Sequence, residues 1–319
     1  MQVKSRAVLG QISDIDLRLL RVFRSVVECG GMAAAELELN IATSTISRHI
    51  KDLETRLGLT LCRRGRGGFA LTPEGERIHA ETLRLLAATD GFRASVDDIH
   101  QRMGGELHLA VFDKTASNPQ ARIADAVALF RAQAPGVALN LHVGSLNLIE
   151  RGVMDGQFQL GIIPEHRRSD SLAYDELFGE TMLLYCGAAH PLFAAEAPGP
   201  GWEGLRRHAF AGLGYHSPNM EIAHREGLRR DATGFDQESV ATLILSGQFL
   251  GFLPDHYAES FVRAGRMRAV QPALACYACR FSAITRRSPA PPRATQLLRD
   301  CLLQAHRGLQ VPDSGIKMT

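Results

Sequence analysis

The sequence is poor in cysteine and has no long apolar stretch. Its six cysteines, scattered over 319 residues, are too few and too irregular for the disulfide framework of a secreted protein. A membrane-spanning helix needs a run of about 18 apolar residues, and none is present. The first 14 residues lack the apolar core and cleavage pattern of a signal peptide. These absences lead us to expect a cytoplasmic protein.

The chain also lacks the short motifs of common enzymes. It has no Gly-x-Ser-x-Gly turn, no Walker loop and no His-Glu-x-x-His pair, and its 12 histidines show no metal-ligand spacing. We therefore expect no catalysis, no cofactor and no metal. An enzyme with a binding-protein-like domain stays as a remote alternative.

The small net charge of +2 conceals an uneven distribution. Residues 1–72 contain 11 Lys and Arg against 7 Asp and Glu, a balance of +4, whereas the remainder contains 25 against 27, a balance of −2. A basic N-terminal module favours a polyanionic partner such as double-stranded DNA.

The N-terminal residues have the spacing of a helix-turn-helix, over residues 32–51. Asp16 is expected to cap a preceding scaffold helix that ends at Gly30 and Gly31. A short helix follows over residues 32–39, and Asn40 is a plausible turn residue. The next helix carries apolar residues at intervals of 4, 3 and 4 that should face inward, namely Ile46, Ile50, Leu53 and Leu57.

Hydroxyl and basic side chains occupy the outward positions of that helix. Hydroxyls near a helix start can contact base edges or phosphates, and basic groups neutralise the DNA backbone. We expect this recognition helix to contact a major groove through Thr43, Ser44, Thr45, Ser47, Arg48 and Lys51. After Gly58, two short apolar runs flank a glycine-rich tip, which predicts a wing whose Arg63, Arg64 and Arg66 bind phosphates or the minor groove.

The order of these features resembles the LysR-type transcriptional regulator family. The matching stretch runs over residues 15–72, and its core is Ile-Ser-Arg-His-Ile-Lys-Asp-Leu-Glu-Thr-Arg-Leu-Gly at residues 46–58. The family commonly has Ser-Gln-Pro-Ala at the helix start, where this chain has Ala42-Thr43-Ser44-Thr45. Glutamine can make bidentate contacts to adenine and threonine cannot, so the base preference is expected to differ.

A long helix is predicted over residues 74–103. Apolar and threonine residues at alternating spacings of 4 and 3 form a heptad seam, namely Ile78, Thr82, Leu85, Thr89, Phe92, Val96, Ile99 and Met103. A helix of about 30 residues spans about 45 Å, which is too long to bury against one small domain. We expect it to pair two chains, and the resemblance also implies a homodimer, a homotetramer on promoter DNA and an influence on RNA polymerase.

The remaining sequence alternates strand and helix patterns, which predicts a mostly parallel sheet covered by helices. The resemblance implies a two-lobed, periplasmic-binding-protein-like effector domain. The full expectation is thus a multidomain α/β protein with these parts: an arm (1–14), a winged helix-turn-helix (15–72), a linker helix (73–103), an effector domain (104–308) and a tail (309–319). Lobe 1 is expected over residues 105–175 and 281–308, and lobe 2 over 176–280.

Ligands of such sheets bind beyond the carboxyl ends of the strands. This rule and the family resemblance select candidate effector-binding residues, namely Lys114, Thr115, Ser145, Asn147, Pro164, His216 and Ser217. A lysine, a histidine and hydroxyls favour a small carboxylate as the effector. In the alternative interpretation, Lys114 is solvated or paired with Asp113 or Glu165.

A thiol-based redox sensor on the same scaffold is a further alternative. Cys276 and Cys279 have a C-x-x-C spacing, but no second pair completes a zinc site. On a strand, residues three apart point to opposite faces, which disfavours a bond between these two. A regulator that needs no ligand is also compatible with the sequence.

Overall fold

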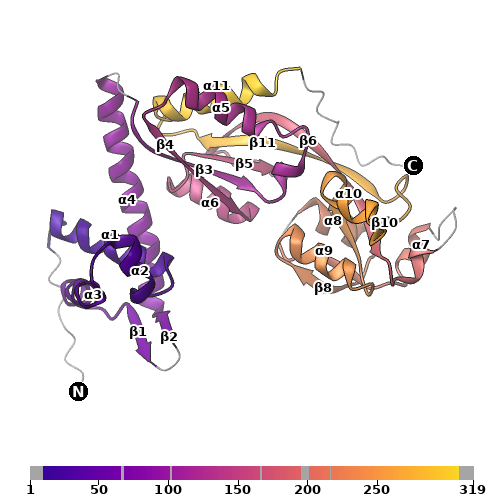
Figure 1. Ribbon diagram of the computed structural model, residues 1–319, viewed down its shortest axis with the longest axis horizontal. Coiled ribbons are helices and arrows are strands. Elements are labelled where there is room, and N and C mark those ends of the chain that lie inside the picture. The colour runs from indigo at the N-terminus through magenta and orange to yellow at the C-terminus, as the bar shows by residue number, and fades with distance from the viewer. Residues whose placement is uncertain are drawn as a thin grey trace. The chain divides into compact units, whose positions relative to one another are not determined.

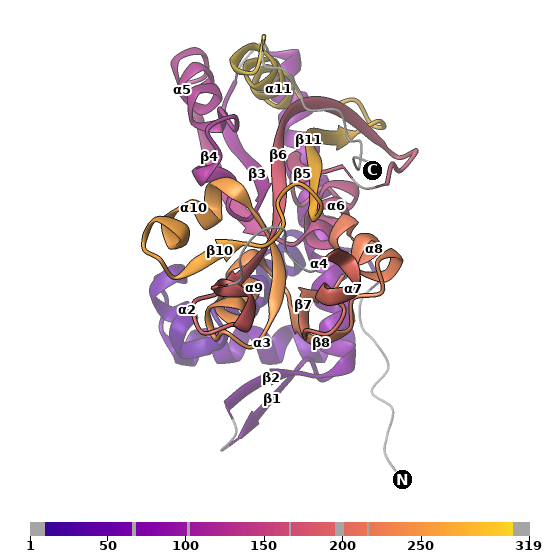
Figure 2. The same ribbon diagram turned by 90° about the vertical axis from the view of Figure 1, so that its right-hand side faces the viewer.

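The computed structural model of the chain describes residues 10–65, 68–100, 103–165, 167–194, 201–215 and 217–308 (Figures 1 and 2). The chain divides into two compact units, Met1–Val96 and Asp97–Thr319. The predicted tail, residues 309–319, and most of the predicted arm lie outside the described residues. Within the described ranges, no helix is both long enough and apolar enough to cross a membrane.

The N-terminal unit consists of helices and a two-stranded wing. Strands β1 and β2 pair antiparallel, with Cys62 opposite Leu71. In chain order the elements are α1 (Asp14–Glu28), α2 (Met32–Leu39), α3 (Thr43–Leu57), β1 (Cys62–Gly65), β2 (Gly68–Leu71) and α4 (Pro73–Ile99). Helices α2 and α3 end where the sequence pattern predicts, because a residue in the left-handed conformation follows each, with φ of 50° at Asn40 and 66° at Gly58.

One apolar core holds α1, α2 and α3 together. Phe23 of α1 is fully buried against this core, as are Ile46 and Ile50 on the inner face of α3. Leu53 is also buried, and Leu57 packs at the edge. Each such side chain contributes about 2 kcal/mol to folding. Packing of the inner face therefore fixes the orientation of α3, and with it the direction in which the side chains of its outer face point.

Helix α1 begins earlier than the sequence pattern predicts. Ser13, and not Asp16, is its N-cap residue. The Asp16 carboxylate accepts hydrogen bonds from the Ser13 backbone N–H (2.8 Å) and hydroxyl (2.6 Å). It also binds the Arg56 guanidinium of α3 through two nitrogens, at 2.5 and 2.9 Å. Asp16 thus ties α1 to α3 in addition to stabilising the start of its own helix.

Close backbone contacts fix the start of α4 beside the wing. The Thr72 hydroxyl donates to the Thr60 carbonyl (2.6 Å) and accepts from the Gly75 N–H (2.8 Å). A Cβ at position 75 would lie 2.0 Å from the Leu61 carbonyl oxygen, so only glycine fits there. The helix ends at Ile99, before the predicted end at Met103.

The C-terminal unit is built on one mixed sheet with the strand order β4-β3-β5-β11-β6-β9-β7-β8, and β10 pairs with β6. The predicted mostly parallel sheet is corrected here. The parallel pairs lie at the two ends, whereas β11 is antiparallel to both β5 and β6. The strands are β3 (Gly105–Phe112), β4 (Val137–Gly144), β5 (Leu160–Pro164), β6 (Leu172–Gly187), β7 (Phe210–Leu213), β8 (Arg230–Gly234), β9 (Leu250–Pro254), β10 (Met267–Ala269) and β11 (Cys276–Arg286).

Helices gather into two groups along this sheet, one at each end of the long strands β6 and β11 (Figure 1). The first group packs with β3, β4 and β5, and the second with β7, β8 and β9. The ladder between β6 and β11 shifts register between Phe281 and Ser282. The helices are α5 (Ile123–Gln133), α6 (Leu146–Asp155), α7 (Gly201–Leu205), α8 (Pro218–Arg225), α9 (Gln237–Leu245), α10 (Asp255–Arg263) and α11 (Arg293–Ala305), with the 3₁₀ turns η1 (Thr115–Ser117) and η2 (Pro191–Phe193).

Helix α5 begins at Ile123, after a turn that follows η1. The Asn118 carboxamide oxygen accepts from the Gln120 N–H (2.9 Å), and its nitrogen donates to the Gly179 carbonyl on β6 (3.0 Å). These bonds hold the segment after η1 in a turn against the sheet, so regular helix begins only at Ile123.

Candidate functional site

The outer face of α3 is the first candidate site. Ser44, Arg48 and Lys51 are exposed there, one and two turns apart. Thr45 and Ser47 are half-buried. Hydroxyl and cationic side chains therefore lie together on one surface of α3, and the opposite surface packs in the core. This arrangement suits a DNA groove, whose edges are lined with phosphates.

Thr43 differs from the other predicted contact residues of α3. Its hydroxyl donates to the Glu36 carboxylate of α2. This bond joins the two helices of the helix-turn-helix at the turn. Thr43 therefore has a structural partner within the protein, in addition to its predicted role.

The wing carries the second group of predicted DNA-contacting residues. Arg63 is exposed, and it lies within strand β1, not in the tip as predicted, because the strand continues to Gly65. Arg66 and the side chain of Arg64 lie outside the described residues. Behind the wing, one oxygen of Glu54 accepts from the backbone N–H groups of Leu61 (2.7 Å) and Cys62 (3.2 Å), which holds β1 against α3.

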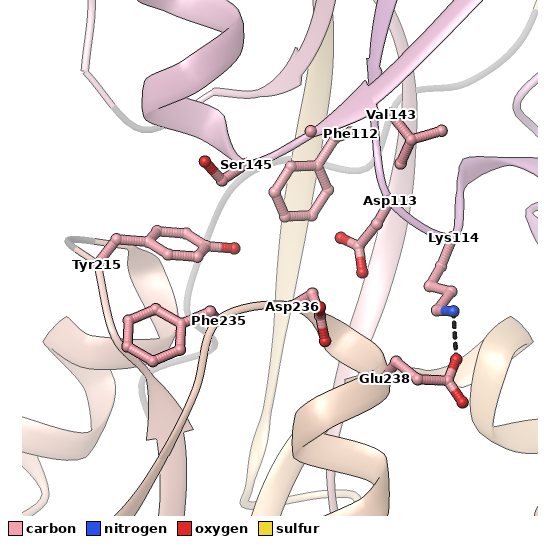
Figure 3. Close-up of a pocket in the computed structure, with 10 residues that line it drawn as sticks. Phe112, Asp113, Lys114, Val143, Ser145, Tyr215, Phe235, Asp236 and Glu238 are labelled. Atoms are coloured by element: carbon pink, nitrogen blue, oxygen red, sulfur yellow. Dashed lines mark hydrogen bonds and ion pairs between the residues drawn. The ribbon is translucent and has the colours of Figure 1, made fainter. Parts of the chain in front are cut away.

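The second candidate site is a cavity of about 300 Å³ in the C-terminal unit (Figure 3). Its volume is at the lower end of the range for small-molecule sites. Both lobes line it, through the segments that follow β3, β4, β7 and β8. The lining residues are Phe112, Asp113, Lys114, Val143, Gly144, Ser145, Tyr215, Phe235, Asp236 and Glu238.

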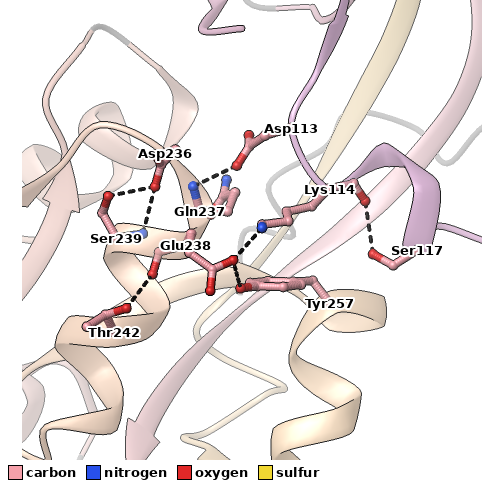
Figure 4. A network of polar contacts seen from close by, with 9 residues as sticks. All are labelled: Asp113, Lys114, Ser117, Asp236, Gln237, Glu238, Ser239, Thr242 and Tyr257. Carbon is pink, nitrogen blue, oxygen red and sulfur yellow. Dashed lines mark hydrogen bonds and ion pairs between the residues drawn. The ribbon is translucent and has the colours of Figure 1, made fainter. Parts of the chain in front are cut away.

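Polar contacts bridge the two lobes beside this cavity (Figure 4). The Lys114 ammonium binds the Glu238 carboxylate at 2.5 Å and lies 4.8 Å from the centre of the Tyr257 ring. The Tyr257 hydroxyl donates to the same Glu238 oxygen at 2.9 Å. The Gln237 backbone N–H donates to Asp113 at 2.8 Å. The start of α9 is therefore held against the segment after β3.

A second bridge runs through a histidine. The Ser117 hydroxyl lies 3.0 Å from His256 Nδ1, and His256 Nε2 lies 3.1 Å from the Glu180 carboxylate on β6. Burial raises the pKa of Glu180, and the hydrogen bond from His256 opposes that shift. This chain of contacts joins both lobes to the strand that connects them.

Of the predicted effector residues, Lys114 and Ser145 line the cavity. Lys114 is paired with Glu238, a partner that the sequence reasoning did not consider. His216 lies outside the described residues. Its neighbour Tyr215 lines the cavity.

Four predicted residues do not belong to the lining that the structure describes. The Thr115 hydroxyl turns back to the Phe112 carbonyl (3.3 Å). Asn147 is exposed on α6, and Pro164 is buried where β5 pairs with β11. Ser217 is the N-cap of α8 and accepts from the Met220 N–H (3.4 Å). Thr115, Pro164 and Ser217 therefore have structural roles within the fold.

The sequence reasoning missed Phe235, Asp236 and Glu238, which come from the second lobe. They follow β8, a strand that no apolar alternation in the sequence indicates. With that strand recognised, the rule that ligands bind beyond strand ends would have selected them. The helix-capping pattern of Asp236 and Ser239 was the available signal, since the Asp236 carboxylate accepts from the Ser239 N–H at 2.7 Å.

Comparison with known proteins identifies both units of the chain. Residues 17–76 match the family model of the bacterial regulatory helix-turn-helix protein, lysR family, and residues 100–307 match the LysR substrate binding domain. The HTH-type transcriptional activator BauR of Pseudomonas aeruginosa is 42% identical over 284 residues, which cover 89% of this chain and 93% of BauR. The chain belongs to the LysR family of transcriptional regulators.

Solved structures of LysR regulators share its fold. The crystal structure of CbnR, a LysR family transcriptional regulator, has a TM-score of 0.62 at 18% identity and covers 91% of this chain and 99% of CbnR. Full-length CbnR complexed with its target DNA has a TM-score of 0.60 at 19% identity, with the same coverage. This LysR-type regulator therefore combines a DNA-binding helix-turn-helix with an effector-binding domain, as the sequence predicted.

The thiol-sensor alternative is not favoured in this LysR-type regulator. Cys276 and Cys279 both lie on β11, and no cysteine of the chain forms a disulfide. Burial raises the pKa of the Cys279 thiol well above its usual value, and the Glu180 carboxylate adds to this shift. A redox sensor needs an accessible thiolate, which this environment opposes.

Proposed function

We propose that this LysR-type regulator reads operator DNA through Ser44, Arg48 and Lys51 on the outer face of α3, with Thr43, Thr45 and Ser47 beside them and the wing on the backbone. The observation that carries the proposal is the exposure of these cationic and hydroxyl groups on a helix whose other face is fully buried. Basic groups at such a position neutralise phosphates, and the hydroxyls are short enough to approach base edges.

The test uses duplexes selected by the protein from a random-sequence pool. Arg48→Ala should weaken binding to all duplexes about tenfold and reduce the slope of log affinity against log salt by about one. Ser44→Ala should change which duplexes are preferred and leave the slope unchanged. Arg229→Ala, at an exposed arginine of the C-terminal unit, is the control. Identical behaviour of the Arg48 and Ser44 variants across sequences would show that the two roles are wrongly assigned.

We propose that α4 pairs two copies of the chain. Phe92 and Ile99 are 72% and 78% exposed, and Val96 between them is 37% exposed. These residues follow one another at heptad spacing, and an apolar stripe of this kind is covered by a partner helix in a coiled coil. Phe92→Glu should shift the sedimentation of the protein toward the monomer, and the neighbouring Arg93→Glu should not.

A small molecule in the cavity of the C-terminal unit is the proposed effector. Ligand between Asp113 on one lobe and Asp236 on the other would change the balance of lobe-bridging contacts. In a dimer, and in the homotetramer that we also propose, this change would alter the spacing of the DNA-binding units. It would thereby alter the access of RNA polymerase to the promoter. The setting proposed for these events is the bacterial cytoplasm.

A further inference from the structure

The charged groups that line the cavity are mostly acidic. Asp113, Asp236 and Glu238 contribute carboxylates, and Lys114 is the one basic side chain among the described lining residues. The Lys114 ammonium is already bound by Glu238 at 2.5 Å. That pair leaves two carboxylates, and no described residue forms an ion pair with Asp113 or Asp236. The Lys114 charge also acts on Asp113 and Asp236, but one cation offsets only one of three carboxylates, so an incoming anion would meet a net negative charge.

The two remaining carboxylates come from different lobes. Asp113 follows β3, and its pKa is raised, chiefly by burial. Asp236 precedes α9, and its pKa is lowered by the hydrogen bonds from Ser239, so it stays ionised. In Figure 3 the Asp113 carboxyl group points into the space between the lobes, whereas the Asp236 carboxylate lies at the start of α9, where one of its oxygens accepts from the Ser239 N–H and hydroxyl. A cation placed there could bind both and would offset the cost of burying Asp113.

The aromatic residues of the cavity fit the same kind of ligand. The Tyr215 hydroxyl is buried without a hydrogen-bond partner among the described residues, and it points toward the centre of the cavity in Figure 3. Its oxygen can accept a hydrogen bond from an N–H group. Phe235 is 69% exposed at the same site, so its ring is accessible to a ligand in the cavity. Ring faces also attract cations.

We infer that the effector of this cleft carries a protonated amine, which binds between Asp113 and Asp236 beside Tyr215. The inference rests on the proposed function of the cavity as the effector site and specifies the chemistry of its ligand. It replaces the small carboxylate expected from the sequence, because the lysine that supported a carboxylate is occupied by Glu238. An ammonium held by both aspartates would join the two lobes.

The test compares three probes of equal size and different charge: propylamine, 1-propanol and propionate. They are added at millimolar concentration to the full-length protein in phosphate buffer free of amines, at constant ionic strength. At ten times its dissociation constant, propylamine should raise the unfolding midpoint of the C-terminal unit by about 3 °C or more. 1-Propanol and propionate should leave the midpoint unchanged. Titration calorimetry gives the dissociation constants.

Conservative variants locate the binding. Asp113→Asn and Asp236→Asn should each weaken propylamine binding about tenfold or more, since each loses one charge contact. Asparagine is also a good N-cap, so the second variant keeps α9 intact. Glu203→Gln, at an exposed carboxylate on α7, is the matched control and should bind as the wild type does.

The outcomes separate this inference from the proposed function. Propionate binding that is lost in Lys114→Met would overturn the inference and uphold the cleft as the effector site. Propylamine binding unaffected by both aspartate variants, or no response to any probe, would also overturn it. In each case the DNA-binding test of Arg48 and Ser44 stands independently, because it requires no ligand.

Discussion

The two units of this regulator each hold an aspartate with restricted access to water, and they do so in opposite ways. In the N-terminal unit, Asp16 is 1% exposed, and the Arg56 guanidinium binds it through two nitrogens, which lowers its pKa far below the usual value. In the C-terminal unit, Asp113 is half-buried in the cavity wall, and its principal hydrogen bond comes from the neutral Gln237 backbone. Burial there raises its pKa.

This difference separates a group that stabilises the fold from one that is available to a ligand. A paired and fully hydrogen-bonded carboxylate holds two helices in a fixed relation, as α3 requires if its outer face is to meet DNA in one orientation. A buried carboxylate without a cation is unfavourable for folding, and such groups concentrate where proteins bind ligands. The contrast predicts opposite effects when each aspartate is neutralised.

The largest effect is expected at Asp16. Asp16→Asn removes the charge that binds Arg56 and should destabilise the N-terminal unit by about 2 kcal/mol. DNA affinity should fall with it, because the position of α3 depends on this contact. The measurement is urea unfolding followed by circular dichroism. Asp14→Asn, at an exposed carboxylate in the same first turn, should change stability by no more than about 0.5 kcal/mol. Equal effects of the two variants would contradict the role of the Arg56 pair.

The effect at Asp113 should have the other sign. Asp113→Asn keeps an oxygen that can accept from the Gln237 N–H and removes the buried charge. In the absence of ligand it should stabilise the C-terminal unit by about 1 kcal/mol, the usual gain when a strained functional group is neutralised. Calorimetric unfolding of the full chain measures this gain. A loss of stability would mean that Asp113 is structural, and the comparison with Asp16 would fail.

The contrast also shows which parts of the molecule the sequence could predict. Helix α2 begins and ends at the predicted residues, and α3 ends at Gly58 as predicted, because capping residues and apolar spacing act within a few positions of the chain. The partner of Asp16 lies 40 residues away, and the partner of Lys114 lies 124 residues away. No local pattern encodes such pairs, so the sequence reasoning took Asp16 for a cap and Lys114 for a ligand-binding cation.

The cavity illustrates the same limit. Ser145 was predicted because it follows a strand that its apolar residues reveal. Asp236 was missed because β8, with the sequence Arg-Asp-Ala-Thr-Gly, has no apolar alternation. This strand forms at the edge of the sheet because β7 is beside it, which is a long-range cause. Ligand-binding residues can be predicted from strand ends only where the strands themselves are predicted.

The smallest expected effect is a difference between two pH profiles, and it tests the electrostatic part of the comparison most directly. The folded-state pKa of Asp16 is below its unfolded value of 3.8, so its contribution to stability is complete above that pH and is lost as the pH falls below it. The folded-state pKa of Asp113 is above 3.8, so protonation relieves its unfavourable charge as the pH falls through that raised value. The gain at Asp113 therefore precedes the loss at Asp16 on acidification.

Other groups titrate in the same range, so the profile of the wild type alone does not isolate Asp113. Buried histidines with lowered pKa values oppose the gain, including His190, whose pKa is lowered to about 4. The charged and titratable groups that act on Asp113 are Lys114, Asp236, Glu180, Tyr215 and Tyr257. All of these remain in Asp113→Asn, so subtracting its stability profile from that of the wild type removes most of their contribution.

The variant's gain in stability over the wild type should shrink by less than about 1 kcal/mol as the pH falls from 7 toward 4. With saturating propylamine, this gain should already be absent or reversed at pH 7, because the bound ammonium favours the ionised aspartate. An advantage that is constant with pH would show that the effect of the substitution is steric and that the charge of Asp113 is not what distinguishes the cleft from the N-terminal unit.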